Sequence, residues 1–148
     1  MTRPEKSLQS PGAGADITGT MGRSILSVIA GYFTMLIAVT GALGFLFLVA
    51  FDEFPTDPAA AYTGGAWVLW AELGVSGLAA AAGGYVCAWV ARRRPLAHAG
   101  ALTGLVAVLG IVSALTDAGL KPLWSSIGIV LIAIPAIMAG AWLRARAG

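Results

Sequence analysis

Four long apolar runs constrain this chain more than any other feature of its sequence. They cover Ile25–Phe51, Ala66–Ala91, Ala97–Leu115 and Pro122–Leu143. About 20 helical residues cross a hydrocarbon core about 30 Å thick, and every run is long enough to do so. None of the runs alternates polar with apolar residues, as the strands of a membrane barrel do. Because lipid offers the backbone no hydrogen-bond partners, we predict four transmembrane helices.

The composition agrees with a membrane protein and excludes several kinds of site. Of 148 residues, 58% are hydrophobic and 11% are charged, whereas soluble domains have about 25% charged residues. The single cysteine, Cys87, rules out a disulfide within the chain. Cys87 and the single histidine, His98, are too few for the usual nitrogen- and sulfur-ligated metal sites. We therefore expect no metal, no cofactor and, at a net charge of +2, no nucleic-acid partner.

Charge in the connecting segments predicts the orientation of the helices. Eight of the nine basic residues fall on one side of the predicted membrane: Arg3, Lys6, Arg23, Arg92, Arg93, Arg94, Arg144 and Arg146. The other side holds Lys121 together with Asp52, Glu53, Asp57 and Asp117. By the positive-inside rule both termini face the cytoplasm. The fold class that we predict is an all-α, transmembrane four-helix bundle in the inner (plasma) membrane of a bacterium.

The domain organisation is simple. Residues 1–22 are polar and contain several prolines and glycines, so we expect a disordered cytoplasmic tail. Residues 23–148 form one four-helix transmembrane domain, and Met21 is an alternative start to Met1.

Small residues recur four positions apart in three of the predicted helices. The pairs are Gly77 with Ala81, Ala80 with Gly84, Gly100 with Gly104, and Ala136 with Gly140. In lipid, such spacing lets two helix backbones approach closely. Two interpretations stay open: contacts within the chain, and a homodimer that forms through the Gly100–Gly104 face.

Glu72 is a carboxylate inside a predicted membrane span that is otherwise almost wholly apolar. It follows Ala66 by six residues, which places it about 9 Å along a helix, whereas half of the hydrocarbon core is about 15 Å thick. Residues at helical spacing from Glu72 form a small stripe, Ser76, Ala79 and Gly83, that we expect to face the bundle. At similar depth the other predicted helices carry Gly44, Gly110, Ser113, Ser125, Ser126 and Gly128.

These residues predict a polar pocket with two alternative roles. Glu72 is either a buried anchor that hydrogen-bonds inside the bundle or a site for a proton or a cation, as ionisable residues in membranes often are. Desolvation favours a neutral carboxyl, so we expect Glu72 to be protonated at neutral pH unless Lys121 pairs with it. From these residues the candidate site comprises Glu72, Ser76 and Ser126.

Two stretches resemble a known family of transporters. "GGAWVLWAELGVSG" and "PLWSSIGIVLIAI" are similar to parts of the small multidrug resistance exporters, although here they fall on the second and fourth helices rather than the first and third. The resemblance implies that Glu72 exchanges protons for cationic drugs and that Trp124 walls the pocket. Separately, "GGYVCAWVARRRPLAHA" resembles a group of uncharacterised, small, bacterial four-helix integral membrane proteins that have no known activity.

The sequence shows no catalytic constellation, so we expect no enzyme. The first functional interpretation is an accessory or scaffold subunit, embedded in the lipid bilayer as a homodimer or within a larger membrane complex. The alternative is a proton-coupled transporter of a small molecule or cation that acts as an oligomer through Glu72.

Overall fold

Four α-helices make up the part of the chain that the structure describes. This computed structural model describes residues 13–51, 66–91, 94–116 and 122–147. The helices are α1 (Ala13–Phe51), α2 (Ala66–Ala91), α3 (Pro95–Thr116) and α4 (Leu123–Ala147). Each contains a stretch long and apolar enough to cross a membrane. The prediction of an all-α chain with four candidate membrane spans is therefore confirmed, by length and apolarity.

Helix α1 begins earlier than the sequence analysis predicts. The structure is helical from Ala13, whereas composition favours disorder through residue 22. Once an apolar span has nucleated a helix, each further residue adds a hydrogen bond at little cost, so the helix extends into its polar neighbours. Residues 1–12 of the expected tail lie outside the described residues.

Helix α3 begins at a sharp turn of the backbone. Arg94 has a φ of 52°, in the left-handed region, and Pro95 follows it as the first helical residue. Proline suits this position because its missing N–H would have no partner in the first turn of a helix. The carbonyl oxygen of Arg94 accepts the backbone N–H of Ala97 at 3.1 Å. The helix thus starts two residues before the predicted Ala97.

Helix α4 ends later than predicted. It runs to Ala147, four residues beyond Leu143. Arginine side chains in the last turn favour this extension because they complement the partial negative charge at the helix C-terminus. The Arg146 guanidinium also lies 3.6 Å from the centre of the Trp142 ring, one turn earlier on the helix.

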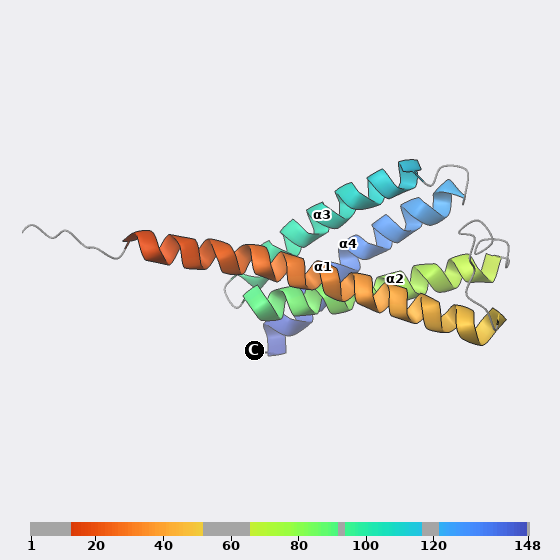
Figure 1. Cartoon of the computed structure of the whole chain (residues 1–148), viewed down its shortest axis with the longest axis horizontal. Coiled ribbons are helices and arrows are strands. Elements are labelled where there is room, and N and C mark those ends of the chain that lie inside the picture. The colour runs from red at the N-terminus through yellow and green to blue at the C-terminus, as the bar shows by residue number, and fades with distance from the viewer. Residues whose placement is uncertain (1–12, 52–65, 92–93, 117–121, 148) are drawn as a thin grey trace, which may run out of the picture.

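Helix α2 is the centre of the bundle. It packs most extensively against α4 and α1, and it also contacts α3. Figure 1 shows α3 and α4 side by side, with α1 lying across α2. Helix α1 has the smallest buried fraction of the four helices. Of its residues 22–49, whose burial the structure describes, two are buried, Ser27 and Gly31. The buried core consists mostly of alanines around Cys87, Leu102 and Ile137.

Glycines fix where α2 crosses its two main neighbours. A Cβ atom added at Gly84 would overlap the backbone carbonyl of Ile137, and one added at Gly140 would overlap the carbonyl oxygen of Ala81. On the α1 side, a Cβ at Gly31 would lie 2.9 Å from the carbonyl oxygen of Gly83. Both crossings therefore bring backbones together at distances that a side chain would prevent.

The small-residue pairs have different positions in the structure. Gly84 and Gly140 lie at the α2–α4 crossing, and a Cβ at Gly77 would lie 2.9 Å from the Ile132 side chain. In contrast, Gly100 and Gly104 are exposed, and nothing lies within 4 Å of a Cβ added at either. The contact within the chain that we expected at this pair is absent from the described residues. Helix α3 instead buries another face, which carries Ala99 and Leu102, and the homodimer stays a prediction.

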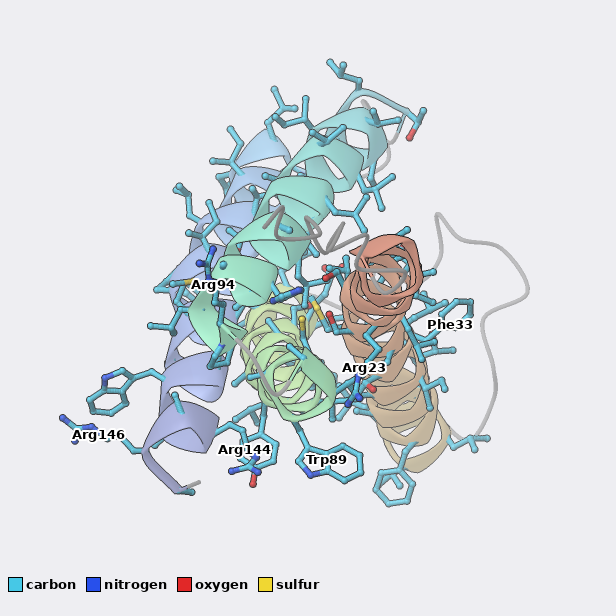
Figure 2. The ribbon with its side chains drawn as sticks, turned by 90° about the vertical axis from the view of Figure 1, so that its left-hand side faces the viewer. Arg23, Phe33, Trp89, Arg94, Arg144 and Arg146 are labelled. Carbon is cyan, nitrogen blue, oxygen red and sulfur yellow. The ribbon has the colours of Figure 1, made fainter. Side chains whose placement is uncertain are left out.

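Arginines gather at one end of the bundle. Figure 2 looks at this end and labels Arg23, Arg94, Arg144 and Arg146 together with Trp89. The antiparallel order of the helices brings these positions together, because α2 ends, α3 begins and α4 ends at this end of the bundle, and the first turns of α1 extend past it (Figure 1). Lys121 and the acidic residues expected at the opposite end lie outside the described residues.

The crossing at Gly84 predicts a large difference between two glycines of α2. Gly84→Ala should destabilise the protein by about 1–3 kcal/mol, because the added methyl group must displace the backbone of α4. The matched control is Gly74→Ala, since Gly74 is exposed with nothing within 4 Å of an added Cβ, and it should change stability by about 0.5 kcal/mol or less. Thermal unfolding in detergent compares the two. Equal losses would contradict the observed crossing.

Candidate functional site

Glu72 lies in the second turn of α2, on the face that we expected to be buried. Its side chain is half-buried, and its Oε2 atom is fully buried. Ser76, Ala79 and Gly83, at helical spacing from Glu72, are all buried. Leu78, on the opposite face, is 76% exposed. The small residues that we expected to face the bundle are therefore buried, and the larger Val68, Leu69 and Leu73 of the same helix are buried with them.

A pocket of about 330 Å³ adjoins Glu72. Each of the four helices contributes to it: Tyr32, Met35, Leu36 and Val39 from α1, Glu72 and Ser76 from α2, Val106, Leu109, Gly110 and Ser113 from α3, and Ile129 and Ala133 from α4. Eight of these residues are apolar or glycine, and four carry a carboxyl or hydroxyl group. The pocket therefore resembles other ligand sites in being mostly apolar with a few polar groups.

Two of the predicted site residues do not line the pocket beside Glu72. Ser76 lines the pocket beside Glu72, but Trp124 and Ser126 do not. Trp124 packs instead against Trp70, with ring centroids 5.7 Å apart and planes at 41°, while Ser126 is buried elsewhere in α4. Trp124 thus lies outside the pocket that the resemblance implied it would wall.

Ser125 is also absent from the pocket. Its side chain is fully buried, and its hydroxyl makes no hydrogen bond to any described residue. Lys121, the predicted ion-pair partner of Glu72, lies outside the described residues. The predicted pairing stays a prediction.

Tyr32 is the pocket residue that the sequence analysis did not single out. It follows Gly22, the start of the candidate span in α1, by ten residues, which is about 15 Å along the helix. In a membrane-spanning α1, a tyrosine at that position would lie far from either membrane interface, where aromatic residues with a polar group are enriched. This unusual position of a tyrosine within the span is the sequence feature that could have identified Tyr32 as a pocket residue.

Several other hydroxyls in the spans have a local explanation. Thr34, Thr103 and Thr116 each donate a hydrogen bond to the carbonyl oxygen four residues earlier in the same helix. Threonines bonded in this way satisfy their own hydroxyls without a ligand or a second helix. Their presence in an apolar span therefore does not indicate a site.

The groups around the pocket limit its chemistry. It offers one carboxyl and the hydroxyls of Tyr32, Ser76 and Ser113. Within the described residues, no three His, Cys, Asp or Glu side chains lie close enough together to hold a metal ion. A carboxyl with hydroxyls nearby can take up a proton or accept hydrogen bonds from a cation.

No known protein family, curated protein or solved structure matches this chain. The similarity to the small multidrug resistance exporters therefore rests on the two sequence stretches alone.

Proposed function

We propose that this chain is a membrane-embedded carrier in which Glu72 binds a proton and a cationic ligand in turn. The observation that carries the proposal is the pocket, which joins the Glu72 carboxyl to hydroxyls from α1, α2 and α3 inside a part of the bundle that is apolar enough to lie in a membrane. Ionisable residues within membrane spans are costly, and they commonly mark ion or proton pathways.

The exchange follows from the cost of charge in an apolar environment. An ionised carboxylate in the pocket is expensive unless a counter-charge accompanies it. Protonation removes the charge, and a bound cation compensates it, so the two ligands compete for one group. A pocket of about 330 Å³ has the size of other small-molecule sites and would hold a small organic cation.

The setting that we propose is the inner (plasma) membrane of a bacterium, with several spans and both termini in the cytoplasm. The cluster of arginines at one end of the bundle supports this orientation by the positive-inside rule. We assign no enzymatic reaction to the chain.

A cation-binding measurement tests the carrier proposal. Tetraphenylphosphonium, an apolar monovalent cation, should bind the purified protein in detergent and release about one proton for each cation bound. In Glu72→Gln the affinity should fall by about tenfold or more, because the amide cannot supply the negative charge. Calorimetry and a pH-sensitive dye measure binding and proton release.

The control for this measurement is Trp124→Phe. Trp124 lies outside the pocket, so its replacement should leave both affinity and proton release unchanged. Binding that survives Glu72→Gln, or that depends on Trp124 as strongly as on Glu72, would contradict the proposal.

A second candidate function is an accessory or scaffold subunit of a homodimer or a larger membrane complex. The observation that favours it is the open glycine face of α3, where Gly100 and Gly104 are exposed with nothing packed against them. Small residues on an outer face let the helix of another chain approach the backbone.

Crosslinking in native membranes tests the second candidate. In a Cys87→Ser background, Gly104→Cys should form a disulfide-linked dimer on oxidation if two copies meet at this face. Ile37→Cys is the control, because Ile37 is 70% exposed on a different helix, α1, and it should remain monomeric. Equal crosslinking at both positions would indicate random collision, and a Gly104 adduct with a different protein would indicate a mixed complex.

A further inference from the structure

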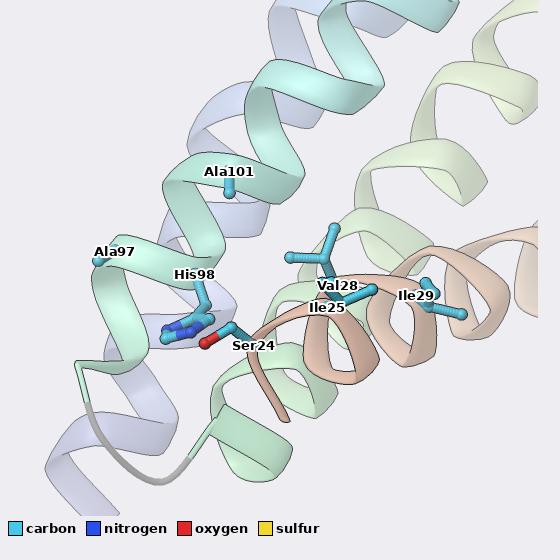
Figure 3. Close-up of a pocket in the computed structure, with 7 residues that line it drawn as sticks. All are labelled: Ser24, Ile25, Val28, Ile29, Ala97, His98 and Ala101. Atoms are coloured by element: carbon cyan, nitrogen blue, oxygen red, sulfur yellow. The ribbon is translucent and has the colours of Figure 1, made fainter. Parts of the chain in front are cut away.

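A second cavity lies between α1 and α3, at the arginine-bearing end of the bundle. Its volume is about 470 Å³. Its walls are Ile25, Val28 and Ile29 from α1 and Ala97 and Ala101 from α3, and they are entirely apolar. Figure 3 shows Ala101 of α3 on the side of that helix that faces Val28 and Ile25 of α1. The result is a mostly apolar cleft that is open to the surroundings of the bundle.

Two polar side chains stand at one end of this cleft. Figure 3 shows Ser24 of α1 and His98 of α3 pointing toward one another. The His98 ring is held in place, because Nδ1 lies 3.0 Å from the carbonyl oxygen of Arg94. A carbonyl oxygen can only accept a hydrogen bond, so Nδ1 must donate its hydrogen to it. The other ring nitrogen, Nε2, is then directed away from that carbonyl.

The charge at this end of the bundle has one sign. Arg23 precedes Ser24 directly and Arg94 lies one turn before His98 in the sequence, and neither arginine lines the cleft itself. The cleft also adjoins the N-terminus of α3, where the helix dipole places partial positive charge. Among the described side chains of residues 22–49, 66–91, 94–116 and 122–147, Glu72 is the one acidic residue. It lies in the N-terminal half of α2, away from the arginine-bearing end of the bundle.

We propose that this cleft binds an anionic phospholipid, with one acyl chain along the apolar walls and the phosphate accepting hydrogen bonds from the Ser24 hydroxyl and from Nε2–H of a doubly protonated His98. The apolar walls suit a hydrocarbon chain, and the polar residues lie at one end of the cleft, as a headgroup requires. Positive charge at that end matches the phosphate, as in basic pockets between membrane helices that hold lipid headgroups. The proposal is independent of the function of the Glu72 pocket.

Lipid titration of the purified full-length protein in detergent, followed by native mass spectrometry, tests this site. Phosphatidylglycerol should bind with a first site about fivefold tighter than phosphatidylcholine, the preference expected from one basic contact. His98→Ala should remove this preference. Ala101→Phe should prevent binding of both lipids at the site, because the ring fills the cleft; Ala101 is exposed, so the substitution does not enter the core.

Two controls separate a built site from general attraction. Arg146→Gln removes a charge at the same end of the bundle but on α4, where the arginine stacks on Trp142, and it should leave the first lipid site unchanged. Inorganic phosphate at the same concentration should not displace the lipid. Equal binding of the two lipids, an equal loss in Arg146→Gln, or displacement by free phosphate would overturn the proposal. The proposal would also be overturned if Ala101→Phe still binds the lipid but no longer forms a dimer that the wild-type protein forms. That result would show that the cleft binds a second copy of the chain.

Discussion

The backbone contact between α2 and α4 is the constraint on which the rest of this structure depends. At Gly84 and Gly140 a carbonyl oxygen of the opposite helix occupies the place where a Cβ atom would stand. Lipid provides no hydrophobic force that drives helices together, so close approach of backbones is what stabilises such a crossing. Gly83 also brings the backbone of α2 close to that of α1, where a Cβ atom would lie 2.7 Å from the carbonyl oxygen of Gly31. Glu72 lies twelve residues, about 18 Å, from this crossing along α2, at a level where residues of all four helices line a partly open pocket.

Much of this arrangement could be predicted from sequence, but not the pairing of faces. The ends of α2 and the inward face of Glu72 follow from run length and from the stripe of small residues, because both are properties of one helix. The spacing of Gly100 and Gly104 equally predicts a close contact, yet a pattern on one helix cannot identify which helix covers it. Trp124 and Tyr32 show the same limit: the resemblance to a known family implied that Trp124 lies beside Glu72, whereas Tyr32 lines the pocket.

The two cavities share α1 as a wall. Tyr32, Met35, Leu36 and Val39 border the Glu72 pocket, and Ser24, Ile25, Val28 and Ile29 border the cleft at the arginine-bearing end. Between them, Gly31 is the point at which α1 touches α2. A Cβ atom at Gly31 would also lie 2.9 Å from the Leu102 side chain of α3. Gly31 is therefore a close contact of α1 with both α2 and α3, and it separates the two cavities along α1.

The central claim is that Glu72 exchanges protons through its pocket, and infrared spectroscopy of the protein in lipid tests it most directly. As the pH is lowered, a carboxylic acid band should grow in the wild-type protein, shift in D₂O and be absent from Glu72→Gln. Such a band identifies a carboxyl that takes up protons from water. If the spectra of wild type and Glu72→Gln change identically with pH, or if the Glu72 band does not shift in D₂O, the carboxyl is a sealed structural anchor and the carrier proposal is wrong.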